Sequence, residues 1–135
     1  MLELLEKSKT GILAWVGKDG FPETRWMSPG INNDAVVAIT MEDFPKVIDL
    51  EKNNAVQWMF QNPELTEIVN VYGKVQIIED AGYKSEILEK LSKNLVAIWK
   101  LKEDGDFVVL ETIIEKAVYY DTMNGIKTLV KFEEE

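Results

Sequence analysis

The residue types best suited to hold a ligand lie in one short stretch, Gly17 to Asn32, with the sequence GKDGFPETRWMSPGIN. Arg25 is the only arginine in the chain, and Trp26, Met27 and Ser28 follow it directly. A guanidinium can hold a phosphate through two parallel hydrogen bonds, and an aromatic side chain can stack on a planar ring. The stretch allows two interpretations: a strand end with one exposed charge and two core residues, or a platform for a phosphorylated planar ligand.

A second candidate site follows in the segment ITMEDFPKVIDL. Thr40 ends an expected strand, and Lys46 lies in the first turn of an expected helix. A hydroxyl, a lysine and the N–H groups of a helix N-terminus can together bind a phosphate. The alternative is an ordinary capped helix, with Asp43 serving the cap.

The chain is also rich in tryptophan, with Trp15, Trp26, Trp58 and Trp99 among its 135 residues. Tryptophan is favoured in cores and at interfaces, so most of the four are expected in one of these places. Carboxylates are so numerous that no pair of them can be singled out for acid–base chemistry.

Composition excludes several classes of function. The chain has no histidine and no cysteine, which excludes Ser-His-Asp and Cys-His catalysis as well as disulfides and zinc–thiolate sites. The net charge of −9 argues against binding to nucleic acid or to an anionic membrane. No apolar run approaches the ~20 residues of a membrane span, and the amphipathic start MLELLEKSK is not a signal peptide. We therefore expect a soluble, cytoplasmic protein.

The elements that must position the candidate residues are mostly short strands. Apolar and β-branched runs predict strands over residues 12–16, 22–27, 35–40, 55–61, 67–79, 107–114, 117–121 and 126–132. Helices are predicted over residues 1–9, 44–53 and 81–94. Hairpin turns are expected at Lys18-Asp19-Gly20 and at Asn124-Gly125, and Gly73 predicts a bulge or a bend.

These elements predict one mainly β domain of the α+β class over residues 1–135, with a frayed acidic tail at 133–135. Antiparallel pairings with short turns favour a barrel or a sandwich with a flanking helix.

The order of the motifs resembles the FMN-binding split barrel of the pyridoxamine 5′-phosphate oxidase family, and especially its general stress protein branch. The resemblance covers nearly the whole chain. It is carried by GILAWVGKDGFPETRWM, by Thr40 and Lys46 with five residues between them, and by the segments NNAV, VNVYG and AVYYD.

The resemblance implies a split β-barrel with flanking helices that forms a homodimer, with two FMN sites at the interface. Arg25, Trp26, Met27 and Ser28 match positions that line the flavin ring and ribityl chain. Thr40 and Lys46 match the phosphate site, and Gln57 and Trp58 would contribute to the cleft. FMN is the expected cofactor, with a deazaflavin as the alternative.

The chain also departs from the family pattern. Phe44 stands where the family often has Ser or Thr, and the charges of Glu42 and Asp43 beside it would oppose a phosphate. The Arg and His that bind substrate near the C-terminus of the pyridoxamine phosphate oxidases are not found, so oxidation of vitamin B6 is not expected.

Three functions fit these features. The first is a flavin-dependent oxidoreductase acting on a small molecule, with an electron donor such as NAD(P)H, since the cofactor carries the redox chemistry. The second is a carrier or sensor that binds a flavin or another planar ligand without turnover. The third is a degenerate family member with an empty cleft that acts through protein contacts.

Overall fold

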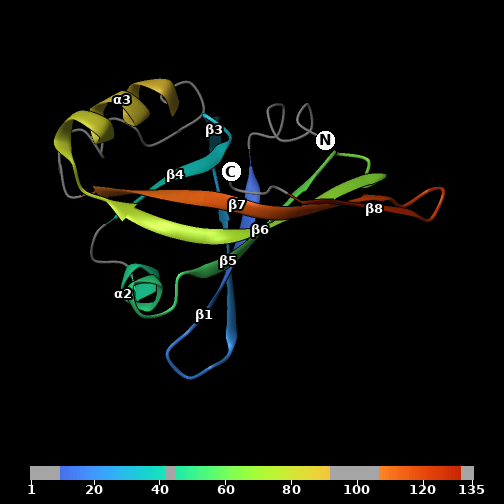
Figure 1. Cartoon of the computed structure of the whole chain (residues 1–135), viewed down its shortest axis with the longest axis horizontal. Coiled ribbons are helices and arrows are strands. Elements are labelled where there is room, and N and C mark those ends of the chain that lie inside the picture. Colours follow the sequence, from blue (N-terminus) through green and yellow to red (C-terminus); the bar gives the residue numbers. More distant parts are fainter. Residues whose placement is uncertain (1–9, 42–44, 92–106, 132–135) are drawn as a thin grey trace.

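The computed structural model describes residues 10–41, 45–91 and 107–131. Within these ranges the chain forms the following elements (Figure 1): β1 (Gly11–Val16), β2 (Pro22–Met27), β3 (Gly30–Asn32), β4 (Ala35–Met41), α2 (Pro45–Lys52), β5 (Ala55–Gln61), β6 (Glu67–Ile78), α3 (Ala81–Leu91), β7 (Phe107–Asp121) and β8 (Ile126–Lys131). Neither α2 nor α3 is long and apolar enough to cross a membrane. The helix expected over residues 1–9, the tail at 133–135, Trp99 and the segment 42–44 lie outside the described residues.

The eight described strands form one antiparallel sheet. Their order is β2-β1-β5-β6-β7-β4-β3, and β8 pairs with β7. In Figure 1 the long strands β6 and β7 run between α2 and α3. The predicted mainly β architecture with flanking helices is therefore confirmed.

Both predicted hairpins are present, and glycine serves the turn in each. β1 pairs with β2 from Gly11↔Met27 to Val16↔Pro22, and Gly20 in the turn has a φ of 83°. β7 pairs with β8 across the four-residue loop 122–125, in which Gly125 has a φ of 68°. A positive φ costs glycine little, because glycine has no Cβ.

One short hairpin was not predicted. β3 has only three residues and pairs with β4 through Asn32↔Ala35. Asn33 and Asp34 form the connecting turn, with φ values of 49° and 68°. Two consecutive positive φ values are the requirement of a type I′ turn, for which Asn and Asp are suited residues.

β4 is buried on both of its faces, which accounts for its uninterrupted apolar sequence. Val36 and Ala38 pack in the main core. Val37, on the opposite face, packs with Val109 of β7 and Ile87 of α3. The face of α3 that carries Ile87 and Leu88 is therefore the buried face, as its apolar spacing predicts.

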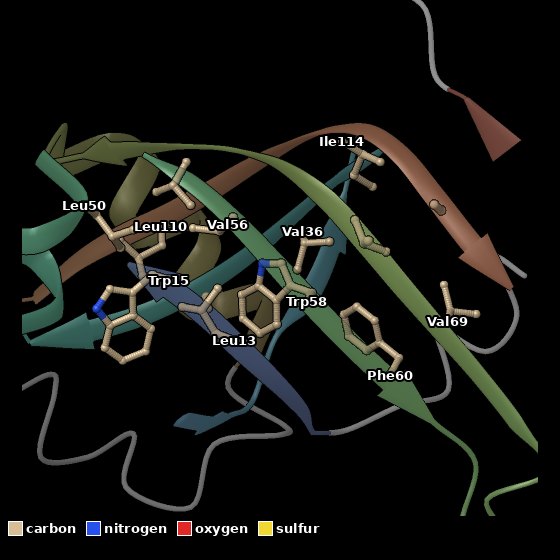
Figure 2. Packing of buried hydrophobic residues seen from close by; sticks show 14 of the residues in the cluster. Leu13, Trp15, Val36, Leu50, Val56, Trp58, Phe60, Val69, Leu110 and Ile114 are labelled. Atoms are coloured by element: carbon tan, nitrogen blue, oxygen red, sulfur yellow. The ribbon is translucent and has the colours of Figure 1, made fainter. Parts of the chain in front are cut away.

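The main core lies between the strands and α2, and Figure 2 shows its largest side chains. Trp58 and Phe60 of β5 stack with their ring centroids 5.9 Å apart. Trp58 is fully buried, and its Nε1 donates a hydrogen bond of 2.9 Å to Thr112 Oγ1. The polar atom of this indole is thus satisfied inside the core, as buried polar groups usually are.

A β-bulge joins what the sequence suggested were two strands. Residues 107–114 and 117–121 were expected as separate strands, but β7 runs without a break from Phe107 to Asp121. Gly73 pairs with Ile114 and Tyr72 pairs with Lys116, so Glu115 is an extra residue. The polar residues between the two apolar runs mark this bulge and not a chain break. Of the bulge or bend predicted at Gly73, the bulge is confirmed.

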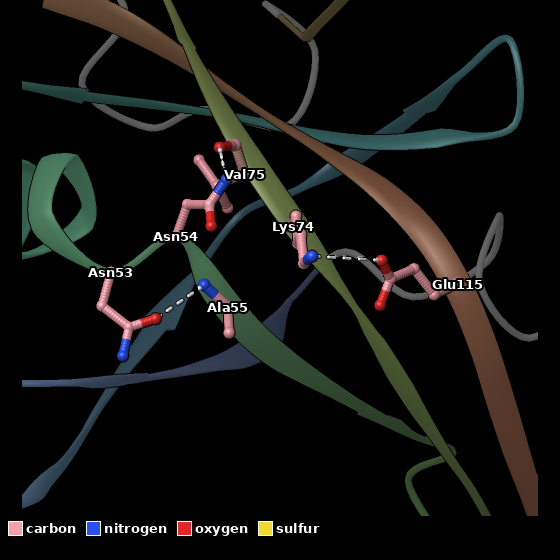
Figure 3. Close-up of polar contacts among 6 residues, drawn as sticks. All are labelled: Asn53, Asn54, Ala55, Lys74, Val75 and Glu115. Atoms are coloured by element: carbon pink, nitrogen blue, oxygen red, sulfur yellow. Dashed lines mark hydrogen bonds and ion pairs between the residues drawn. The ribbon is translucent and has the colours of Figure 1, made fainter.

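The connection from α2 to β5 is fixed by two asparagines (Figure 3). Asn53 Oδ1 accepts a hydrogen bond of 3.2 Å from the backbone N–H of Ala55. Val75 N–H of β6 donates to the carbonyl of Asn54 at 2.9 Å, and Asn54 Nδ2 donates to the carbonyl of Val75 at 3.4 Å. These contacts fasten the C-terminal end of α2 to the sheet, and so they fix the helix that carries Lys46.

Candidate functional site

A cavity of about 940 Å³ lies where the β1–β2 hairpin meets α2. Its wall combines three kinds of side chain. The basic ones are Lys18, Arg25, Lys46 and Lys52. The apolar ones are Trp15, Phe21, Trp26 and Ile48. The acidic ones are Asp19, Glu23 and Asp49.

Arg25 and Lys46 approach each other in this cavity from different elements. Arg25 lies on β2 opposite Leu13 of β1, and Leu13 points into the core. Cross-strand partners share a face of the sheet, so Arg25 projects toward the side on which α2 packs. Lys46 is the second residue of α2, and only 7% of its surface is exposed.

The electrostatics of Lys46 reflect this position. Burial lowers the pKa of Lys46 below its usual range, and the positive charge of Arg25 lowers the pKa further. Two cations that repel each other in a partly desolvated cavity are a suitable arrangement for an anion, because a bound anion offsets both the repulsion and the desolvation.

The charge of the cavity wall is opposite to that of the whole chain. Four basic and three acidic side chains line the cavity, whereas the chain carries a net charge of −9. The local excess of positive charge would attract an anionic group to this place on an otherwise acidic protein.

The apolar part of the wall is open to solvent. Trp26 is 63% exposed and Phe21 is 71% exposed, and Ile48 of α2 is also exposed. Large exposed apolar side chains that gather at one cavity mark a surface that binds a ligand or a partner. The cavity therefore offers an apolar, partly aromatic surface beside a cationic one.

Three of the eight residues predicted for the site come together here, namely Arg25, Trp26 and Lys46. The described residues that line the cavity do not include the other five: Met27, Ser28, Thr40, Gln57 and Trp58.

Met27 and Ser28 are half-buried at the end of β2 and just after it. Gln57 and Trp58 are neighbours on β5, so their side chains point to opposite faces of the sheet. The structure makes Trp58 a core residue and corrects its expected place in the cleft, since its ring is covered on all sides. Gln57 is half-buried on the outer face.

Thr40 lies near the end of β4 and is 4% exposed. Its Oγ1 is buried and has no hydrogen-bond partner among the described residues. A buried hydroxyl without a partner costs free energy, which is a feature of a group that a ligand could satisfy.

Sequence reasoning missed the contribution of α2 beyond Lys46. Lys46, Asp49 and Lys52 follow each other at intervals of three residues, and all three line the cavity. That spacing places side chains on one face of a helix, so the pattern K-x-x-D-x-x-K was a usable signal. Trp15, the aromatic residue of β1 that also lines the cavity, carried no such signal.

Comparisons with known proteins agree with this fold. A family model described as "Pyridoxamine 5'-phosphate oxidase" matches residues 1–121. No curated protein matches the sequence.

Three solved structures are similar over most of the chain. The General Stress Protein 26 from Bacillus anthracis str. Sterne has a TM-score of 0.76 at 20% identity, covering 97% of this chain and 95% of that one. A Clostridium acetobutylicum protein related to general stress protein 26 of B. subtilis has a TM-score of 0.78 at 22% identity, covering 96% and 90%. An F420 reductase has a TM-score of 0.69 at 20% identity, covering 85% and 93%. At these identities the likeness concerns the fold, and it confirms the split barrel.

Proposed function

The chain belongs to the pyridoxamine 5′-phosphate oxidase family, and from this premise we propose that it is a flavin-dependent oxidoreductase that binds FMN in the cavity between the β1–β2 hairpin and α2. The observation that carries the proposal is the approach of Arg25 and Lys46 in one cavity that also contains an exposed tryptophan.

The residues present fit the two halves of FMN. A phosphate needs cationic donors, and Arg25 can offer a bidentate fork while Lys46 offers a point charge. A planar ring needs flat apolar contacts, and Trp26 presents most of its surface to solvent. The cavity of about 940 Å³ is within the range of roughly 300–1,000 Å³ that ligand sites commonly have.

In this proposal the protein binds the flavin, fixes its orientation and excludes water from one side of it. A bound flavin would itself supply the hydride and electron transfer. Arg25 and Lys46 would fix the phosphate end, and Trp26 would set the plane of the ring. A deazaflavin is the alternative cofactor, and an F420 reductase is among the proteins that share the fold.

We further propose that the active form is a homodimer whose interface includes the outer face of the sheet. Ile12 and Met59 lie side by side across β1 and β5 on that face. Trp26 ends this row on β2, the strand at the edge of the sheet, where it also borders the cavity. Asn70 follows on β6, and its Oδ1 is buried without a hydrogen-bond partner among the described residues. A second copy would cover the apolar row and could satisfy this oxygen. A sedimentation mass near 15.4 kDa, that of one chain, would contradict the dimer.

The experiment that tests the proposed function is a visible absorption spectrum after addition of excess FMN and removal of unbound ligand. We expect retained, protein-bound flavin, whose absorbance NAD(P)H then bleaches under anaerobic conditions. Retained flavin that no nicotinamide donor reduces would favour the carrier or sensor. A protein that retains no flavin would contradict the proposal and leave the degenerate family member.

The affinity for FMN should fall as the pH rises through the lowered pKa of Lys46. A phosphate is attracted only by the protonated amine, so the affinity declines once that amine loses its proton, by at most about tenfold per pH unit for one linked proton. For an ordinary lysine, with a pKa of about 10.4, the decline would begin at higher pH. Titrations of flavin fluorescence at several pH values would measure the effect. Lys46→Arg keeps its charge throughout and should show a flat profile, and an equally flat wild-type profile would contradict the role of Lys46.

A further inference from the structure

One hydrogen bond joins the two elements that form the cavity. Trp15 Nε1 on β1 donates to Asp49 Oδ2 on α2 at 3.0 Å, and the two residues are 34 positions apart in the sequence. Trp15 is 6% exposed, and both residues line the cavity. In Figure 2 the indole of Trp15 lies beside Leu13, and its nitrogen points away from the core cluster.

The two partners of this hydrogen bond lie near the two cations, Trp15 near Arg25 and Asp49 near Lys46. On the sheet side, Trp15 is two residues from Leu13, and Leu13 is the cross-strand partner of Arg25. On the helix side, Asp49 is three residues from Lys46, on the same helix face. The bond therefore ties the strand pair that carries Arg25 to the helix that carries Lys46.

Apolar packing alone would fix the position of α2 on the sheet less firmly than apolar packing together with this hydrogen bond. Val47 and Leu50 bury the core-facing side of the helix, but apolar contacts are non-directional. Arg25 and Lys46 also repel each other, which favours any small shift of the helix that separates them. A hydrogen bond to a carboxylate is directional and is stronger than one between neutral groups, so it can hold the helix in the position that keeps the cations together.

We propose that Trp15 and Asp49 are positioning residues, which hold α2 against β1 so that Lys46 stays beside Arg25 and the two can bind one phosphate. The inference rests on the proposed function, because FMN is the ligand that supplies the phosphate. It assigns a role to two cavity residues that hydrogen-bond each other across the two elements.

The test compares two ligands that differ only in the phosphate, FMN and riboflavin. Trp15→Phe keeps an aromatic ring in the core, removes the donor and leaves every charge in place. It should weaken FMN binding by about tenfold, the lower end of the loss seen when an orienting partner of a metal ligand is removed, and should leave riboflavin affinity unchanged. Asp49→Ala and Asp49→Asn both remove a carboxylate that repels a phosphate, and only Asp49→Asn keeps an acceptor oxygen, so the affinity for FMN should be lower in Asp49→Ala than in Asp49→Asn. Equal losses for both ligands would mean a merely structural role and would overturn the proposal.

A second measurement does not depend on flavin binding. The pKa of Lys46 can be followed by NMR of lysine labelled with ¹³C at Cε, with Lys46→Arg to assign the signal. In the wild type the pKa of Lys46 should lie below the ordinary lysine value, because burial and the charge of Arg25 both lower it. In Trp15→Phe, which leaves every charge in place, it should move toward about 10.4, the ordinary value. An unchanged pKa in this variant would overturn the positioning role. If the wild type bound neither flavin while Trp15→Phe shifted this pKa, the proposed function would fail and the positioning of Lys46 would stand.

Discussion

Replacing Lys46 by methionine should weaken FMN binding by about 10- to 100-fold, and replacing Arg25 by methionine should do at least as much. A hydrogen bond to a charged group contributes about 1.5–3 kcal/mol, and each 1.4 kcal/mol corresponds to about a tenfold change in affinity. Arg25 can make two such bonds to one phosphate. The affinities would be measured by titrating the quenching of flavin fluorescence, for FMN and for riboflavin in parallel.

The matched control is Lys74→Met. Lys74 lies on β6, its side chain is largely exposed, and it forms an ion pair of 3.9 Å with Glu115. This variant changes the net charge by the same amount as Lys46→Met but lies outside the cavity wall. We expect it to bind FMN like the wild type. If Lys46→Met and Lys74→Met lose affinity equally, the effect is one of overall charge and the site assignment is wrong.

The Lys46→Met variant also separates an effect on FMN affinity from an effect on the stability of the fold. The substitution keeps an unbranched side chain of similar length in a buried place, and cores tolerate changes that conserve volume. The thermal midpoint should therefore change little while FMN affinity falls. A fall in both would indicate that Lys46 supports the fold and not the ligand.

Much of the fold could be predicted because it depends on local chemistry. The strand at residues 55–61 alternates in burial along its whole length, and the hairpin turns contain glycines at positive φ. β3 was missed because three residues are too few to show a period. β7 was divided in two because a polar pair within a long strand looks the same in sequence as a loop. Only its pairing with β6 shows that the extra residue is a bulge.

The site was harder to predict than the fold, for a physical reason. Arg25 and Lys46 could be proposed because they match the order of motifs in a family. Trp15 and Asp49 could not, because their contact spans 34 positions and depends on how α2 packs on β1. Trp58 was placed in the cleft together with Gln57, although adjacent strand residues face opposite ways. The alternation of side chains along a strand was enough to predict that Gln57 and Trp58 do not face the same side of the sheet.

Gly73→Ala should lower the free energy of unfolding by about 3 kcal/mol or more, the upper end of what overpacking usually costs. A Cβ added at Gly73 would lie 2.1 Å from the carbonyl oxygen of Ile113 and 3.1 Å from a methyl carbon of Thr112. The first contact is with backbone, so no side-chain rotation can relieve it. Relief requires β6 and β7 to separate at the bulge. Urea denaturation, read as the midpoint at constant slope, measures the loss.

Gly82→Ala is the control that separates this close approach from a general effect of adding a methyl group. Gly82 lies in the first turn of α3, where the nearest atom to an added Cβ is Asp80 Oδ2 at 3.4 Å. Alanine is favoured over glycine inside helices by roughly 0.5–1 kcal/mol, so this variant should be slightly more stable than the wild type. The two alanines should therefore move the midpoint in opposite directions. If Gly73→Ala left the midpoint unchanged, the strands at the bulge would not be as close as the structure has them.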